Sequence, residues 1–220
     1  MKKGNISIFV PHIGCPQKCS FCNQNTITGS SSAPTLVDVK HAVETALLKT
    51  DYEYEIAFFG GSFTAIERAY MLSLLEAAKS YVDSGRIKGI RCSTRPDAID
   101  DEVLNLLKAY GVTAIELGAQ SMNDYVLSAN LRGHTVDDVR KASALIKKYG
   151  FELGLQMMTD LYLSSPETDI ESAKEIIKLN PDTVRIYPTV TLKNTYLEKL
   201  MREGKYAPSS IENTISLCAQ

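Results

Sequence analysis

Three cysteines near the amino terminus, Cys15, Cys19 and Cys22, are set in a C-x3-C-x2-C spacing. Thiolates are the ligands that select zinc, copper(I) and iron-sulfur centres. Three thiolates on a centre that takes four ligands leave one coordination position open, and an open position is where a metal centre does chemistry. The spacing therefore predicts a metal centre in this loop, with one position free for another molecule.

The loop is compatible with more than one kind of site. Zinc would need a fourth ligand, which His12 could supply in a closed Cys3His site. However, all three cysteines fall in one turn region, and Phe21 places a large apolar ring directly before Cys22, where it can shield a cluster. These features favour an iron-sulfur cluster over zinc, and they favour either of these over three buried free thiols.

The bulk composition is that of one globular domain. The chain has 220 residues, of which 44% are hydrophobic and 23% are charged, with a formal net charge of -2. Five cysteines, three of them crowded together, fit a reducing compartment better than a disulfide framework. The apolar run 6–10 is too short for a signal sequence, and no run approaches the roughly 18 residues of a membrane span. We expect a cytoplasmic protein with no membrane partner.

Short β-rich runs alternate with longer helical patterns along the whole chain, which indicates an α/β fold with a parallel sheet. From periodicity alone, a (β/α)6 partial barrel and an open doubly wound sheet both remain open. The expected strands are 6–10, 55–59, 87–92, 113–117, 152–157 and 183–187. The expected helices are 36–48, 65–82, 100–110, 136–149, 166–179 and 209–220.

In both folds, ligands bind at the carboxyl ends of the strands. The cysteine loop follows the first expected strand, and Gly60-Gly61-Ser62 follows the second. Glycines in such a turn let the backbone come close to a ligand. We therefore expect the two segments to lie at the same rim of the sheet.

The cysteine spacing after a first strand, with Phe21 beside the last cysteine, resembles the signature of the radical S-adenosylmethionine (SAM) superfamily. The resemblance implies a partial TIM-type barrel of six β/α units. It also implies that Cys15, Cys19 and Cys22 hold a [4Fe-4S] cluster whose free iron binds SAM. Reductive cleavage of SAM then gives a 5′-deoxyadenosyl radical, with the electron coming from a donor such as flavodoxin or ferredoxin. The glycine turn resembles the motif that meets the methionine end of SAM, except that Ser62 replaces the usual glutamate.

Further stretches narrow the resemblance to the branch with the catalytic Elongator subunit and the oxygen-independent coproporphyrinogen oxidase-like proteins. They are 93–97, 116–121, 130–135 and 186–189. The resemblance implies that Ser93, Gln120, Arg132 and Gln156 face SAM. Amide side chains suit ribose hydroxyls or an adenine edge, and a guanidinium suits a carboxylate. The simpler interpretation of Arg132 is that it forms a surface ion pair. The simpler interpretation of Gln120 is that it lies at a strand end and forms its hydrogen bonds with backbone groups.

Five more side chains are expected to line the rim: Arg95, Glu116, His134, Arg185 and Tyr187. His134 could act as an acid or base, but a histidine after glycine is more often a capping or packing residue, which is the interpretation we favour.

The stretch 160–163, Asp-Leu-Tyr-Leu, departs from the branch, whose members usually carry a Gly-Leu-Pro-Gly-like turn. Residues with larger side chains do not readily adopt the backbone conformations of glycine, so we expect this loop to point in a different direction from that of its relatives. A radical SAM fold that has lost its activity is therefore a further alternative.

The sequence does not identify the substrate, which could be tRNA or a small molecule. We expect residues 1–220 to form one radical SAM core domain, and the helical stretch at its end lacks a stop signal, which suggests a longer protein.

Overall fold

The computed structural model describes residues 2–10, 15, 19–28, 32–49 and 51–220 of the chain. Within them, six parallel strands form a single sheet in the order β1-β2-β3-β4-β5-β6, so each strand pairs with the next one along the chain. The strands are β1 (Lys2–Val10), β2 (Tyr52–Gly60), β3 (Ile90–Thr94), β4 (Val112–Gln120), β5 (Glu152–Thr159) and β6 (Thr183–Pro188).

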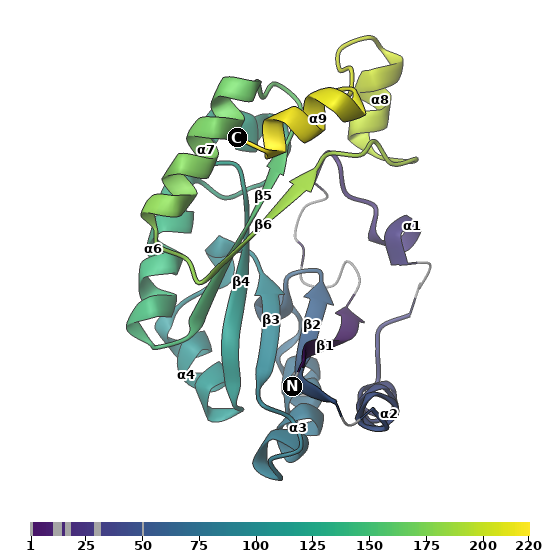
Figure 1. The fold of residues 1–220 in the computed structure, drawn as a ribbon, viewed down its shortest axis with the longest axis vertical. Coiled ribbons are helices and arrows are strands. Elements are labelled where there is room, and N and C mark those ends of the chain that lie inside the picture. Colours follow the sequence, from purple (N-terminus) through teal and green to yellow (C-terminus); the bar gives the residue numbers. More distant parts are fainter. Residues whose placement is uncertain (1, 11–14, 16–18, 29–31, 50) are drawn as a thin grey trace.

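Helices follow the strands and cover the outer face of the sheet (Figure 1). Side-chain caps define several helix starts, as at Thr35, Thr135 and Ser165, where a reciprocal capping box closes the first turn. None of the described helices is long and apolar enough to cross a lipid bilayer. The helices are α1 (Gln24–Thr28), α2 (Leu36–Leu47), α3 (Arg68–Asp83), α4 (Asp101–Ala109), α5 (Asp124–Ala129), α6 (Val136–Lys148), α7 (Pro166–Lys178), α8 (Tyr196–Arg202) and α9 (Ile211–Cys218).

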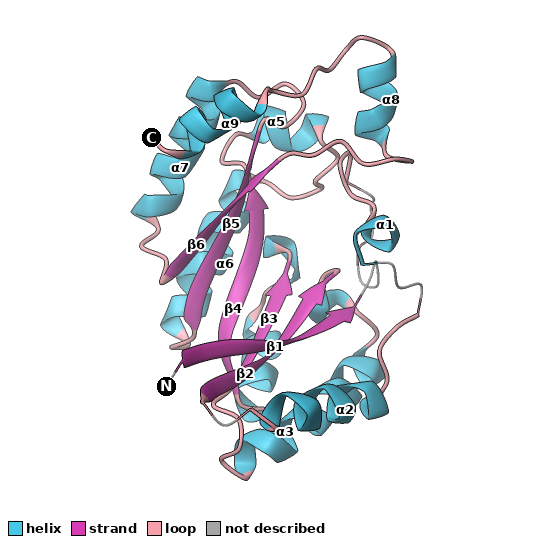
Figure 2. Ribbon diagram, turned by 45° about the vertical axis from the view of Figure 1, so that its right-hand side comes forward, coloured by secondary structure: helices cyan, strands magenta, loops and turns pink. Residues whose placement is uncertain are grey.

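The sheet curls into a partial barrel (Figure 2). Its strand order runs in sequence without the reversal that defines a doubly wound sheet. The curl brings distant strands face to face. As a result, the guanidinium of Arg185 in β6 lies 5.3 Å from the ring centre of Phe59 in β2. One cavity of about 570 Å³ is lined from both β1 and β6. The predicted (β/α)6 partial TIM-type barrel is therefore confirmed, and the doubly wound alternative is wrong.

The two faces of the sheet differ in chemistry. In β1, Ile6, Ile8 and Val10 are buried against the helices, and the residues between them are exposed on the inner face. The inner face carries buried charge lower in the barrel, where Arg91 pairs with carboxylates from β2, β4 and β5 at 2.8 to 3.4 Å. The apolar outer face builds the core, and the polar inner face is left for binding.

Several element boundaries differ from those expected. The strand predicted over 87–92 begins only at Ile90, because the N–H groups of Ile87 and Lys88 bond to carbonyls of Tyr81 and Tyr54. The helix predicted from residue 65 begins at Arg68, because a carboxylate caps two N–H groups of its first turn. The helices α1 and α5 are short and were not predicted.

The loop after β5 keeps a glycine-like backbone without glycine. Asp160 and Leu163 occupy the positions at which members of the Elongator-subunit branch usually have glycine, and their φ angles are 61° and 63°. The N–H of Asp160 donates to the Asp169 carboxylate at 2.8 Å, and its own carboxylate accepts the N–H of Ser209 at 2.7 Å. These bonds hold the left-handed conformation and tie the loop to the segment before α9.

Leu163→Gly should raise the free energy of unfolding by about 1 kcal/mol, because a leucine in the left-handed region carries a steric cost that glycine lacks. Leu163 is 45% exposed, so little packing is lost. Leu48→Gly is the matched control, since Leu48 is also exposed but has a helical φ of -64°. Denaturant unfolding should show stabilisation for the first variant and destabilisation for the second, and a loss of stability in both would contradict the argument.

Asp169→Asn tests a buried carboxyl group in the first turn of α7, which accepts the N–H of Asp160 in this loop, since burial raises the pKa of Asp169 to about 6. Its unfolded-state pKa is about 3.9, so the folded protein holds this proton more tightly and the group's contribution to stability is lost as pH rises through about 6. The free energy of unfolding of the variant minus that of wild type should therefore rise by about 2 kcal/mol between pH 4 and pH 7. A difference that stays flat over this pH range for Asp169→Asn would refute the assignment.

Candidate functional site

A pocket of about 120 Å³ lies at the carboxyl ends of the strands. The cysteine loop after β1 and the glycine turn after β2 both line it, so their expected meeting at one rim is confirmed. Its lining residues are Cys15, Cys19, Phe21, Cys22, Gln24, Gly60, Gly61, Ser93, Thr94, Arg95, Gly118, Gln120, Arg132 and Gln156. Of the residues predicted for metal or cofactor binding, every one except Ser62 is in this lining.

The thiols in the pocket are close enough to influence one another's ionisation. Burial, helped by the neighbouring Cys19 and Cys15, raises the pKa of Cys22 to about 11. Burial also raises the pKa of Cys15, while the positive charges of Arg95 and Arg132 lower it. Burial therefore favours the protonated form of Cys15 and Cys22, and metal binding must release those protons.

The described acidic, histidine and cysteine side chains do not form a ready-made site for a single metal ion. In the part of the chain that the structure describes, no three His, Cys, Asp or Glu side chains converge on a point that one metal ion would occupy. Thiolates that hold a four-iron cluster each bind a different iron, so they surround a larger volume. His12, the fourth zinc ligand considered from the sequence, lies outside the described residues.

The described end of the cysteine loop is anchored by residues far away in sequence. The N–H of Ser20 donates to the carbonyl of Asn130 at 3.0 Å, and its hydroxyl donates to the Asn130 side chain at 2.6 Å. The carbonyl of Ser20 accepts the N–H of Leu197 in α8 at 2.8 Å. Asn130 is fully buried, and its amide group also donates to the carbonyl of Tyr162 at 2.8 Å. One asparagine therefore joins three loops of the rim.

Phe21 packs beside this anchor. Its ring contacts a small apolar cluster formed by Leu197, Leu200 and Tyr206, which Tyr162 also joins. The same residue lines the pocket, so it separates the cysteines from the apolar cluster behind them. This position agrees with the shielding role predicted from the sequence.

The glycine turn makes a close approach that a side chain would block. Gly60 has a φ of 115°, and a Cβ there would lie 2.7 Å from the carbonyl oxygen of Val10. Ser62 lies behind the turn with its hydroxyl 2.9 Å from that of Thr94, and it accepts the N–H of Arg95 at 3.2 Å. Ser62 therefore joins the ends of β2 and β3, and its contact with a cofactor stays a prediction.

Several polar atoms in the pocket are buried without a hydrogen-bond partner among the described residues. They are Ser93 Oγ, Arg95 Nη1, Gln120 Oε1 and Arg132 Nε. Buried polar groups in folded proteins are nearly always satisfied, since an unpaired one costs about 1–3 kcal/mol. These atoms, together with three thiols, fit a pocket that holds a metal centre and a polar ligand with donors and acceptors of its own.

Arg132 and Gln156 are fixed within the lining. Nη1 of Arg132 donates to Cys19 Sγ at 3.0 Å, and its Nη2 donates to the carbonyl of Gly118. Gln156 donates to Glu116 at 2.7 Å, and Arg185 donates to the same carboxylate at 2.8 Å. Glu116 is buried below the pocket and orients Gln156 above it.

His134 is placed as a packing residue. Its Nε2 lies 3.2 Å from the carbonyl oxygen of Ala119, and the side chain does not line the pocket. Burial, helped by the charge of Arg132, lowers the pKa of His134 to about 4, so the ring is neutral at physiological pH. The geometry supports the packing interpretation favoured from the sequence.

The sequence analysis missed Asn130 as an anchor, and it placed Arg95 only at the rim. Asn130 stands in the stretch 130–135 that carried the family resemblance, but its partners Ser20 and Tyr162 are distant in sequence. The larger cavity of about 570 Å³ lies at the opposite, amino-terminal end of the barrel, where Lys3, Glu53 and Lys88 line it with other charged side chains. It is separate from the thiols.

A partial β/α barrel with a three-cysteine loop and a glycine turn at its carboxyl-terminal rim defines the class of this protein. The model of the Radical SAM superfamily matches residues 9–180, and that of the Radical_SAM C-terminal domain matches residues 181–220. The chain belongs to the radical SAM superfamily. The elements β6, α8 and α9 fall within the second match.

Curated relatives include tRNA uridine(34) acetyltransferases and Elongator subunits. The chain is 25% identical to the tRNA uridine(34) acetyltransferase of Dehalococcoides mccartyi (strain CBDB1), covering 92% of this chain and 52% of the relative. It is 32% identical to the enzyme of that name from Methanocaldococcus jannaschii, with 76% and 32% covered. Elongator complex protein 3 of Homo sapiens is also 32% identical, with 76% and 31% covered. The chain thus spans between a third and about half of these relatives.

Solved structures share the fold. The archaeal Methanocaldococcus infernus Elp3 with an N-terminal deletion has a TM-score of 0.77 at 23% identity, covering 98% of this chain and 52% of that one. Coproporphyrinogen III oxidase (HemN) from Escherichia coli has a TM-score of 0.66 at 16% identity, with 99% and 51% covered. These likenesses support the partial barrel.

Asn130→Ala should loosen the cysteine loop. The change removes the acceptor of Ser20 and the donor to Tyr162, so it should lower the free energy of unfolding by about 2 kcal/mol and speed alkylation of the pocket thiols in the metal-free protein. Asn123→Ala is the matched control, because Asn123 caps α5 nearby through N–H groups of Tyr125 and Val126 only. Equal alkylation rates in the two variants would argue against an anchoring role.

Proposed function

We propose that this chain binds a [4Fe-4S] cluster through Cys15, Cys19 and Cys22 and reductively cleaves SAM to a 5′-deoxyadenosyl radical. The observation that carries the proposal is the convergence of three thiols and four unpartnered polar atoms on one pocket at the carboxyl ends of the strands. Membership of the radical SAM superfamily supports it. When bound, the cluster supplies the electron that this chemistry needs.

The lining residues fit the parts of SAM. Gly60 and Gly61 line the pocket and present their backbone groups to the methionine end. Ser93, Gln120 and Gln156 offer hydroxyl and amide groups for the ribose and adenine. Gln120 has a φ of 67°, unusual for a residue other than glycine, and this turns it at the end of β4. Strain at such a position is typical of a binding site.

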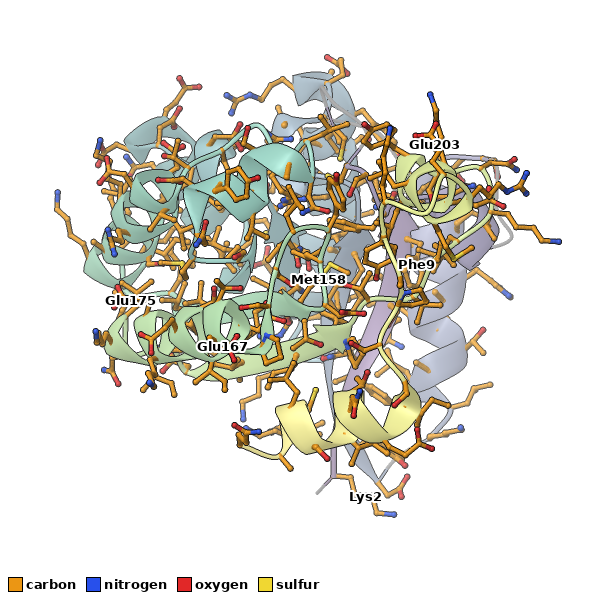
Figure 3. The ribbon with its side chains drawn as sticks, turned by 90° about the horizontal axis from the view of Figure 1, so that it is seen from above. Lys2, Phe9, Met158, Glu167, Glu175 and Glu203 are labelled. Atoms are coloured by element: carbon orange, nitrogen blue, oxygen red, sulfur yellow. The ribbon has the colours of Figure 1, made fainter. Side chains whose placement is uncertain are left out.

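The pocket also limits access of water to the reacting bond. Phe21 and its apolar neighbours close the side next to α8, and buried charges close the lower barrel. Seen from above, Phe9 and Met158 lie toward the middle of the molecule, whereas Glu175 points outward (Figure 3). Apolar side chains above the inner face provide a surface on which a substrate could rest.

For the substrate, we propose a uridine nucleoside within RNA, because several relatives are named as tRNA uridine(34) acetyltransferases. A small molecule is the alternative. We propose flavodoxin or ferredoxin as the electron donor. We also propose that residues 1–220 act as one radical SAM core, which the joining of β6 to the same sheet supports.

Anaerobic reconstitution with iron and sulfide tests the proposal. Wild type should bind about four irons per chain and release 5′-deoxyadenosine from SAM once reduced. Cys19→Ser should lose cluster and cleavage because one thiolate ligand is gone, and Cys218→Ser, remote from the pocket, should keep both. Stoichiometric zinc with no iron uptake would overturn the proposal, and cluster binding without SAM cleavage would indicate an inactive radical SAM fold.

A further inference from the structure

One buried carboxylate lies between residues that line the two cavities of the barrel. Glu116 in β4 is 1% exposed, and its two oxygens have different partners. Its Oε1 accepts from Nη2 of Arg185, which lines the larger cavity, at 2.8 Å. Its Oε2 accepts from Nε2 of Gln156, which lines the cysteine pocket, at 2.7 Å. The carboxylate thus connects a cation on one side with a pocket residue on the other.

The sheet keeps the Glu116 side chain in this position. Glu116 is the register partner of Gly154 in the parallel pairing of β4 with β5. A Cβ at Gly154 would lie 2.8 Å from Cγ of Glu116, so only glycine leaves room for the glutamate side chain at this point of the strand. The packing therefore fixes where the carboxylate lies relative to Gln156.

The bond to Glu116 decides which end of the Gln156 amide is left for a ligand. An ionised carboxylate only accepts hydrogen bonds, so it takes the NH2 group of the amide and leaves the carbonyl oxygen. Gln156 is only part-buried, and no other described residue is bonded to its amide group. The carbonyl oxygen is therefore the group that this side chain can offer within the pocket.

A fixed amide accepts only one kind of partner. A glutamine without such an anchor can turn over and offer either a donor or an acceptor, whereas an anchored one offers a single polarity. A hydroxyl or amino group on a ligand can donate to the oxygen of Gln156. An acceptor of similar size would leave two acceptors facing each other without a hydrogen bond, which weakens binding.

We propose that Glu116 is a positioning residue that makes Gln156 an acceptor-only contact in the pocket, specific for a donor group on the nucleoside part of SAM. The inference rests on the proposed function, because it takes SAM as the ligand of the pocket. It adds a residue that determines specificity without touching the ligand. The groups that donate on the nucleoside are the two ribose hydroxyls and the amino group of adenine.

Glu116→Gln should turn the amide of Gln156 over. The oxygen of the substituted side chain still accepts from Arg185, and its NH2 group then faces Gln156, which must accept there and present its own NH2 group to the ligand. The Gln156 contact in the pocket would therefore change from an acceptor to a donor.

Three analogues of S-adenosylhomocysteine each replace one donor by an acceptor of similar size. They are S-inosylhomocysteine and the 2′-deoxy-2′-fluoro and 3′-deoxy-3′-fluoro forms. Equilibrium dialysis with reconstituted protein should show one of them binding wild type about tenfold more weakly than S-adenosylhomocysteine. In Glu116→Gln, the loss for that analogue should fall to less than about twofold.

Exchange of the two side chains separates positioning from folding. In the double variant Glu116→Gln/Gln156→Glu, an NH2 group again meets an oxygen below the pocket and a carboxylate oxygen faces the ligand, so the tenfold loss should return. Glu55→Gln is the matched control, because Glu55 belongs to the same charged network and its described bonds go to Arg91, at 3.1 and 3.2 Å. It should leave every analogue ratio as in wild type.

Gly154→Ala gives a second test if Glu116→Gln does not fold. A methyl group at this position would push the Glu116 side chain away from Gln156 while keeping its charge. The tenfold loss should shrink in this variant also.

Analogue ratios that are the same in wild type, Glu116→Gln and Gly154→Ala would overturn the inference. The analogue whose ratio changes identifies the donor: S-inosylhomocysteine indicates the adenine amino group, and a fluoro form indicates the corresponding ribose hydroxyl. Failure of reconstituted wild type to bind S-adenosylhomocysteine at all would instead refute the proposed function. Iron and sulfide content is therefore measured first for each protein.

Discussion

The site depends on one geometric constraint, the parallel pairing of six strands in sequence order. Because every strand runs the same way, every strand end opens onto the same rim, and a segment gains access to the pocket simply by following a strand. The curl of the sheet then narrows the inner space until Arg185 of β6 lies over Phe59 of β2. Cysteines, glycines, glutamines and arginines from across the chain meet there without a dedicated binding domain.

Charge is distributed unevenly along the barrel axis. Lower down, four positive and four negative side chains line or adjoin the larger cavity, so that region is an internally neutralised network. They are Lys3, Lys88, Arg91, Arg185, Glu53, Glu55, Glu116 and Glu152. At the upper rim, among the residues that the structure describes, the guanidinium groups of Arg95 and Arg132 have one carboxylate partner, that of Asp97, and the cysteine side chains lie beside them. The excess positive charge at the rim is suited to a negatively charged cluster and ligand, and the balanced network below supports it without competing for them.

The sequence was sufficient for the features that are local. Periodicity predicted all six strands, and the cysteine spacing with the glycine turn predicted the two segments that meet at the rim. It could not predict the role of Asn130, because its partners come from Ser20 and Tyr162, which only the tertiary fold brings near. It also could not predict that the guanidinium of Arg132 donates to Cys19 Sγ, because these two residues are 113 positions apart in the sequence. Left-handed Asp160 was unexpected, because the bonds that stabilise it come from Ser209 and Asp169.

The anchoring of the cysteine loop has a consequence for the order of events during synthesis. Ser20 bonds to Asn130, 110 residues later, and Asn23 bonds to the carbonyl of Lys193, 170 residues later. Contacts of such high sequence separation form late, because the entropy of closing long loops must be overcome first. The cysteine loop leaves the ribosome before both of these partners, and it is therefore fixed in place only after they have been made. Its thiols stay open to solvent, and to whatever delivers iron and sulfide, until almost the whole barrel has folded.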